Sequence, residues 1–144
     1  MTTTRQLAAI MFADIDGYTS IMQDDEALAL HLLDKFRNQL ESTVALHKGR
    51  ILGIRGDGAM CSFNSTLEGV RAALALQLEM QQDPKVPLRI GMHTGDVIIS
   101  GNSIYGDGVN IASRVESFAI PGSILMSGKA QKKKKNQRDL PTLF

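Results

Sequence analysis

The chain has 144 residues, of which 43% are hydrophobic and 22% charged, and its formal net charge is +1. This length suits one compact domain with a sizeable core, and so small a net charge gives no overall field that would attract nucleic acid or a membrane surface. No apolar run approaches the roughly 20 residues that cross a bilayer, and residues 1–6 lack the layout of a signal peptide. We therefore expect a cytoplasmic protein. Its single cysteine, Cys61, is expected to be a small buried hydrophobe rather than a reactive thiol.

The first third of the chain predicts one strand followed by two helices. Residues 7–14 form an apolar run of strand length that ends in Asp14. A turn containing glycine follows, and residues 17–23 are typical of a short helix. Asp24 is the predicted N-cap of a longer helix that Gly49 ends. The apolar residues of that helix recur every three or four positions and predict one buried face, made by Leu28, Leu32, Leu33, Phe36, Leu40 and Val44.

The middle of the chain predicts a hairpin and another helix. Residues 50–63 read as two short strands with Gly56–Gly58 as the turn between them. Ser65 and Glu68 have the spacing of a helix capping box. The stripe predicted behind this cap consists of Val70, Ala73, Leu74 and Leu78.

The last part predicts two strands at 88–92 and 96–100, separated by His93–Gly95. His93 is more typical of a packed histidine at a strand end than of a ligand. A helix follows residues 105–108, and residues 123–126 form a further strand. In that helix Val109, Ala112 and Val115 are predicted to face inward, and Asn110 and Arg114 lie four positions apart on one face.

Strands that alternate with helices and hairpins predict an α+β fold, a ferredoxin-like sandwich in which helices pack on a mainly antiparallel sheet. We assign residues 1–128 to this domain. Residues 129–144 contain four consecutive lysines, Lys132–Lys135, and predict a basic tail, either disordered or the truncated end of the domain. A patch for nucleic acid or acidic lipid is the less favoured reading of these lysines.

Two aspartates carry the first functional hypothesis. Asp14 ends the first strand and Asp57 lies in the hairpin turn, so both carboxylates meet at one end of the sheet if these strands are neighbours. Paired carboxylates suit Mg²⁺ bound to a polyphosphate, because Mg²⁺ takes hard oxygen ligands and keeps positions for phosphate and water. The alternative is that both aspartates are ordinary turn residues. For Asp16 and Asp107 we expect a turn or helix-capping role.

Several segments, taken together and in order, resemble the class III nucleotide cyclases, the family of adenylate and guanylate cyclase catalytic domains. The resemblance covers about residues 6–128. Phe12–Thr19 resembles the first metal-binding segment of the family and Gly56–Gly58 the second. Leu88–Asp96 resembles the strand pair that comes before the family's transition-state segment. Tyr105–Arg114 resembles the transition-state segment itself.

The resemblance implies a homodimer with shared active sites that converts ATP to 3′,5′-cyclic AMP and pyrophosphate. It implies that Asp14, Asp57 and the Ile15 carbonyl hold two Mg²⁺ or Mn²⁺ ions per site. It further implies that Asn110 positions the ribose and that Arg114 stabilises charge on the reacting phosphate. The triphosphate would lie on backbone amides at the start of a helix, those of Ile15, Asp16, Gly17, Tyr18 and Thr19.

The sequence departs from the family pattern at three places. Gly53 stands where the family commonly has a lysine that contacts the base, and Ser103 aligns with a second base-contacting position. Ser103 favours ATP over GTP, because it resembles the threonine of bacterial adenylate cyclases. The family domain also continues past residue 126 into a hairpin with a phosphate-binding lysine, which has no counterpart in this sequence. These departures leave three alternatives: a guanylate cyclase, a degenerate cyclase-like domain for dimerisation or nucleotide sensing, and an unrelated metal-dependent phosphotransferase.

Overall fold

The computed structural model describes residues 3–101, 103–127 and 142–143. The lysine-rich stretch at 132–135 lies outside these described residues. The elements in chain order are β1 (Thr3–Ile15), α1 (Tyr18–Asp24), α2 (Glu26–Leu46), β2 (Arg50–Arg55), β3 (Gly58–Phe63), α3 (Thr66–Met80), β4 (Leu88–Ser100), β5 (Ser103–Tyr105), α4 (Asp107–Ser117), β6 (Ile124–Ser127) and β7 (Thr142–Leu143).

The strands form one sheet in the order β2-β3-β1-β4-β6-β7, with β5 paired to β4. The first four strands of this order, all antiparallel, are those of a ferredoxin-like core. Beyond the core, β6 pairs parallel with β4 and β7 pairs antiparallel with β6. The predicted α+β fold with a mainly antiparallel sheet is therefore confirmed.

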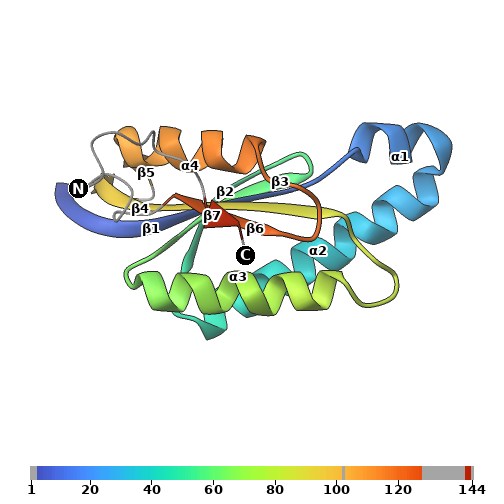
Figure 1. The fold of residues 1–144 in the computed structure, drawn as a ribbon, viewed down its shortest axis with the longest axis horizontal. Coiled ribbons are helices and arrows are strands. Elements are labelled where there is room, and N and C mark those ends of the chain that lie inside the picture. Colours follow the sequence, from blue (N-terminus) through green and yellow to red (C-terminus); the bar gives the residue numbers. More distant parts are fainter. Residues whose placement is uncertain (1–2, 102, 128–141, 144) are drawn as a thin grey trace.

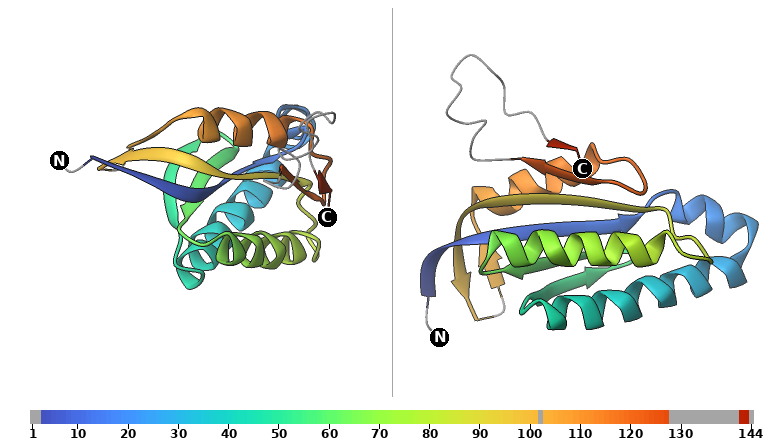
Figure 2. Two further views of the ribbon diagram at one scale, coloured as in Figure 1. Left: turned by 60° about the vertical axis from the view of Figure 1, so that its left-hand side comes forward. Right: turned by 60° about the horizontal axis from the view of Figure 1, so that its bottom comes forward.

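Helices cover both faces of the sheet (Figure 1). Two helices, α2 and α3, lie on one face and α4 lies on the other, as the turned views in Figure 2 also show. Alternate residues of β1 separate the two cores: Ala9, Met11 and Ala13 pack with α2 and α3, whereas Ala8 and Ile10 pack with α4. Because Asp14 follows the second set in this alternation, its side chain belongs to the α4 face.

Helix α2 buries the predicted face. Leu32, Leu33, Phe36, Leu40 and Val44 are all buried, although Leu28 at the start of the helix is exposed. The predicted cap is wrong by one residue, because the side chain of Asp25 rather than Asp24 accepts the Leu28 amide at 3.0 Å. Asp24 is instead the last residue of α1.

Helix α3 turns a different face inward from the one predicted. The Ser65 cap is confirmed, because its hydroxyl accepts the Glu68 amide at 3.2 Å. However, Leu74 is 46% and Leu78 is 65% exposed. The buried face consists of Gly69, Ala72, Ala73, Leu76, Gln77 and Met80. This face has the same helical period, and its small residues let the helix approach the sheet closely: a Cβ on Gly69 would lie 3.0 Å from the Met92 side chain.

The two strands predicted at 88–92 and 96–100 are one strand, β4, which pairs with β1 along its whole length. Gly95 therefore marks close packing rather than a turn, since a Cβ there would lie 2.7 Å from His93 Nε2. His93 is buried, and its Nδ1 hydrogen-bonds to the Ser127 hydroxyl. The expectation of a packed histidine is confirmed. However, His93 lies in the middle of β4 and not at a strand end.

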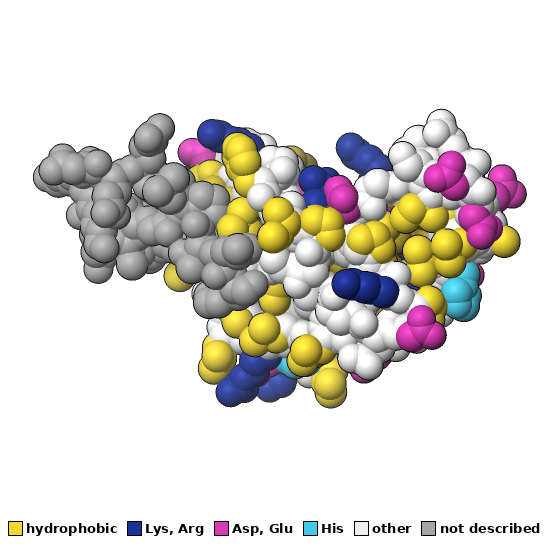
Figure 3. All heavy atoms as spheres, turned by 45° about the vertical axis from the view of Figure 1, so that its right-hand side comes forward, with side chains coloured by type: hydrophobic (Ala, Val, Ile, Leu, Met, Phe, Trp, Pro, Cys, Tyr) yellow, Lys and Arg dark blue, Asp and Glu magenta, His cyan; other side chains and the backbone are white. Residues whose placement is uncertain are grey.

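Cys61 is fully buried in β3, and this burial raises the pKa of its thiol to about 12. The expectation of an unreactive buried cysteine is confirmed, because only the thiolate reacts readily. On the face drawn in Figure 3, Lys and Arg side chains are interspersed with Asp and Glu among exposed hydrophobic side chains. None of the helices in the described ranges is long and apolar enough to cross a membrane.

Candidate active site

The two aspartates singled out from the sequence lie side by side. Asp14 pairs in register with Gly58 of β3, the residue directly after Asp57. The amide of Ile15 donates a hydrogen bond to the Asp57 carbonyl at 3.3 Å. The neighbouring strands therefore bring both carboxylates to one end of the sheet, as expected if β1 and β3 are adjacent.

The turn that carries Asp57 is held from outside the hairpin by Arg37 of α2. Its Nη2 donates to the Gly56 carbonyl at 2.7 Å. Gly56 has a φ of +57°, a left-handed conformation that glycine adopts at little cost. Sequence reasoning missed Arg37, because a single arginine on the surface of an amphipathic helix carries no local signal of such a contact.

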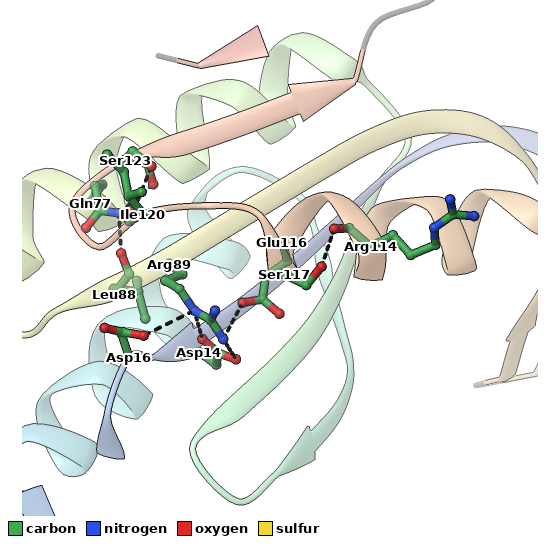
Figure 4. A network of polar contacts seen from close by, with 10 residues as sticks. All are labelled: Asp14, Asp16, Gln77, Leu88, Arg89, Arg114, Glu116, Ser117, Ile120 and Ser123. Atoms are coloured by element: carbon green, nitrogen blue, oxygen red, sulfur yellow. Dashed lines mark hydrogen bonds and ion pairs between the residues drawn. The ribbon is translucent and has the colours of Figure 1, made fainter. Parts of the chain in front are cut away.

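The Asp14 carboxylate is paired with Arg89, the second residue of β4 and its direct partner in the strand register. Arg89 Nε donates to Asp14 Oδ1 at 3.0 Å, and Nη2 donates to Oδ2 at 2.9 Å (Figure 4). This is the two-pronged geometry in which arginine binds a carboxylate most strongly. Arg89 Nε also lies 3.8 Å from Asp16 Oδ1. The hydrogen bond with Asp14 is the main factor that raises the pKa of Arg89.

A third carboxylate, Glu116 of α4, joins this pair from above the sheet. Its Oε2 lies 3.2 Å from Arg89 Nη2, and its side chain is only 12% exposed. Burial is the largest cause that raises the pKa of Glu116, to about 7. The negative charge of Asp14 and a hydrogen bond with Asp14 raise this pKa further, and Asp57 adds a smaller increase. The positive charge of Arg89 lowers it. Negative charge thus converges on this end of the sheet from three elements. Glu116 was also missed, since it reads in the sequence as an ordinary polar helix residue.

A cleft of about 410 Å³ opens beside these carboxylates. Its lining includes Asp14, Gly53, Arg55, Met60, Val109 and Glu116. Gly53 leaves open space, because a Cβ built there would meet no atom within 4 Å. The cleft therefore joins the carboxylate cluster to the position where a base-contacting side chain was expected.

The remaining predicted side chains do not reach this cluster within one chain. Asn110 and Arg114 are exposed on α4, and the Arg114 side chain extends along the helix away from Asp14 and Arg89 (Figure 4). Ser103 pairs with Ser100, eleven positions along β4 from Arg89. At about 3.3 Å per residue, Ser103 is therefore roughly 35 Å along the strand from the residue that pairs with Asp14.

Two of the five amides expected to bind a triphosphate are already used within the fold. The Ile15 amide donates to the Asp57 carbonyl, and the Asp16 amide donates to the Pro87 carbonyl at 2.8 Å. The amides of Tyr18 and Thr19 lie in the first turn of α1, where a helix leaves its amides without an internal acceptor. Of the five backbone amides expected to bind a triphosphate, those of Gly17, Tyr18 and Thr19 therefore remain as candidates.

The donor chemistry at this end of the sheet fits a hard divalent cation. Asp14 and Asp57 offer carboxylate oxygens beside the Ile15 backbone. Asp14 already binds a positively charged group, the guanidinium of Arg89. No cluster of three His, Cys, Asp or Glu side chains with metal-binding geometry occurs within the described ranges. A cation here would therefore need oxygen ligands from water or substrate besides these two carboxylates.

Glu116 reaches the cluster because β4 has a glycine beneath it. A Cβ on Gly91 would lie 2.2 Å from the backbone nitrogen of Glu116. We predict that Gly91→Ala lowers the free energy of unfolding by about 1–3 kcal/mol, since α4 must move away from the sheet. Chemical denaturation measures this change. Gly53→Ala is the matched control and is expected to unfold like the parent, because its Cβ enters open space. Equal stability of the Gly91→Ala and parent chains would contradict this account of how α4 is placed.

Comparison with known proteins identifies relatives across nearly the whole chain. Residues 2–140 match the family model described as the adenylate and guanylate cyclase catalytic domain. A Rhizobium meliloti protein named "Putative adenylate cyclase 3" is 37% identical over 131 residues, covering 85% of this chain and 22% of that protein. The adenylate cyclase of Streptomyces coelicolor is 29% identical over 136 residues, covering 92% of this chain and 35% of its own length. The chain therefore spans about a fifth to a third of the length of these curated relatives.

Solved structures share the fold. The adenylate/guanylate cyclase/hydrolase from Silicibacter pomeroyi superimposes with a TM-score of 0.80 at 30% identity, covering 94% of this chain and 83% of that one. The adenylyl cyclase CyaB from P. aeruginosa gives a TM-score of 0.77 at 23% identity, covering 94% and 84%. At that lower identity, the likeness to CyaB concerns the fold alone.

Proposed function

Because this chain belongs to the adenylate and guanylate cyclase catalytic domain family, we propose that it converts ATP to 3′,5′-cyclic AMP and pyrophosphate. In this reaction the ribose 3′-hydroxyl attacks the α-phosphorus and pyrophosphate leaves. The observation that carries the proposal is the convergence of Asp14 and Asp57 beside a cleft of about 410 Å³. That arrangement is what a polyphosphate substrate bound with divalent cations needs.

Asp14, Asp57 and the Ile15 carbonyl are the proposed ligands of two Mg²⁺ or Mn²⁺ ions. When bound, such ions neutralise phosphate charge and polarise the phosphorus–oxygen bonds. The chain's own groups then orient the substrate. The amides of Gly17, Tyr18 and Thr19 at the start of α1 would receive the phosphate oxygens, and the cleft beside Gly53 would receive the base.

Asn110 and Arg114 are proposed to act on the site of a second copy of the chain. Both side chains are exposed and are carried by α4, and Arg114 points away from the carboxylates of its own chain. Arginine suits a phosphate whose charge rearranges during reaction, because the guanidinium is planar and stays protonated. Asn110 can donate to and accept from a ribose hydroxyl. Ser103, far from Gly53 within one chain, would likewise contact the base from the second copy.

The assay that tests the activity is incubation of the purified chain with ATP or GTP and Mn²⁺, followed by chromatographic identification of the product. Cyclic AMP supports the proposal. Cyclic GMP formed from GTP would instead make the chain a guanylate cyclase, which Gly53 permits because it adds no side chain that selects adenine. Binding of nucleotide without turnover would indicate a nucleotide-sensing domain.

The shared site predicts that two inactive variants restore each other. Asp57→Ala lacks a proposed metal ligand, whereas Arg114→Ala lacks the group given to the partner. In a mixed dimer, one of the two sites receives both intact halves. We expect each variant to be inactive alone. Because a mixed dimer has one intact site of two, each mixed dimer should show up to about half of the activity of a parent dimer, measured after subunit exchange.

A mixture of Asp57→Ala and Asp14→Ala chains is the matched control. Both of these variants lose the same half of the site, so their mixed dimers contain no intact site and should stay inactive. If the first mixture remains inactive although subunit exchange is demonstrated by differently tagged chains, the two halves do not come from different copies.

A further inference from the structure

Arg89 occupies both oxygens of Asp14, the carboxylate to which the proposed function gives a divalent cation. Its Nε and Nη2 donate to Asp14 Oδ1 and Oδ2 at 3.0 and 2.9 Å. The paired guanidinium takes one lone pair of each oxygen, and its positive charge repels a second cation, so Arg89 and a divalent cation compete for Asp14. A cation therefore binds Asp14 more strongly once Arg89 releases at least one of its oxygens.

Glu116 offers the released guanidinium another partner. Its Oε2 is 3.2 Å from Arg89 Nη2, within ion-pair distance, yet the two groups are not aligned for a hydrogen bond. In the described part of the chain, Glu116 Oε2 is one of two buried side-chain atoms without a hydrogen-bond partner. A buried acceptor without a partner is costly, so this oxygen gains from any rotation of Arg89 that aligns Nη2 with it.

The packing of α4 fixes this acceptor beside the arginine. The backbone of Glu116 lies directly over Gly91, two residues along β4 from Arg89. Figure 4 shows the Glu116 carboxylate pointing down to Arg89 on the side opposite Asp16. Asp16 is a poorer alternative partner, because its Oδ1 is 3.8 Å from Arg89 Nε and its side chain is 48% exposed.

We propose that Arg89 is a positioning residue that moves between two carboxylates: it holds Asp14 when no cation is bound and pairs with Glu116 when a divalent cation binds Asp14. Glu116 is thus the counter-ion that lets Asp14 become a ligand, without being a ligand itself. This inference rests on the proposed function in one respect, namely that Asp14 binds the cation. Without Glu116, releasing Asp14 would leave a half-buried guanidinium with only the more distant and exposed Asp16 as a partner, which opposes cation binding.

The thermodynamic test uses Mn²⁺ alone, without nucleotide, titrated into the full chain and followed by calorimetry or by the spin resonance of free Mn²⁺. The pH is kept above the Glu116 pKa of about 7 so that the carboxylate is ionised. We expect Glu116→Gln to weaken Mn²⁺ binding by about 10-fold or more, as substitution of groups that support a metal ligand commonly does. The matched control is Asp16→Asn, which also removes one negative charge near Arg89 and is expected to weaken binding by much less.

A double-variant cycle separates the counter-ion role from direct ligation. In an Arg89→Met background no guanidinium competes for Asp14, so Glu116→Gln should then change Mn²⁺ affinity by less than about threefold. An equal loss of affinity in both backgrounds would overturn the proposal, because it would show that Glu116 acts on the cation itself.

A crystal structure with Mn²⁺ decides the question even if a variant does not fold. We expect Arg89 to be hydrogen-bonded to Glu116 Oε2 and at least one Asp14 oxygen to lie on Mn²⁺. Arg89 still bound to both oxygens of Asp14, or Glu116 coordinated to Mn²⁺, would refute the exchange and leave the proposed cyclase activity standing. Failure of the parent chain to bind Mn²⁺ at Asp14 and Asp57 would refute the metal site of the proposed function, and the exchange with it.

Discussion

Asp57→Ala and Asp14→Ala are each expected to abolish metal-dependent turnover, a loss of at least about 10²-fold in maximal rate. Each removes one of two carboxylates that meet at the end of the sheet, and a site with one negative ligand fewer holds Mg²⁺ poorly. Steady-state kinetics over a range of Mn²⁺ and Mg²⁺ concentrations measures the effect.

The fold should survive the change at Asp57. Its side chain lies in a hairpin turn and is only partly buried, and the carbonyl that accepts the Ile15 amide is kept in alanine. Circular dichroism and thermal unfolding check this point. Asp24→Ala, an exposed aspartate at the end of α1, is the control and should retain full activity. Parent-like turnover by the Asp57→Ala or the Asp14→Ala chain would refute the two-metal assignment.

Arg114→Ala is expected to lower the maximal rate by about 10²-fold or more, with little change in the Michaelis constant. Removal of one donor that stabilises charge developing in a transition state has an effect of this size. A group that acts only as charge rearranges contributes to rate rather than to substrate binding. The side chain is exposed and makes no ion pair within the described residues of its own chain, so loss of rate would not reflect unfolding.

Two control variants sharpen this experiment. Arg71→Ala removes an exposed arginine from α3, on the opposite face of the sheet, and should behave like the parent. Arg114→Lys keeps a positive charge but loses the planar fork, so a partial rate would show how much of the effect depends on geometry. An unchanged maximal rate with weaker substrate affinity in Arg114→Ala would instead assign Arg114 to ground-state binding.

The sequence by itself determined the elements whose signals are local. The apolar run that ends in Asp14, the turn at Asp57 and the buried face of α2 follow from residue spacing within each segment, and the structure has them where expected. These features are readable because strand and helix periods, glycine turns and caps depend on neighbours within a few residues. These local signals placed Asp14 and Asp57 at the ends of their own segments, and the pairing of β1 with β3 then brought them to one end of the sheet.

Local signals failed where two readings fitted equally well. In α3, one stripe contains Leu74 and Leu78 and another contains Ala73 and Leu76, and both have helical spacing. The second is buried because small residues allow closer approach to the sheet. Gly95 reads as a strand break, yet it is kept in β4 because the neighbouring strand pairs through it and His93 fills the space of its missing side chain.

Only the tertiary structure decided which groups surround Asp14. Arg89 is its partner because antiparallel register places two residues that are 75 positions apart side by side. Glu116 joins them because α4 crosses β4 at Gly91, where the absence of a Cβ lets the helix backbone come close. Such contacts depend on strand register and on helix placement over the sheet, which are properties of the packed core and not of any segment alone.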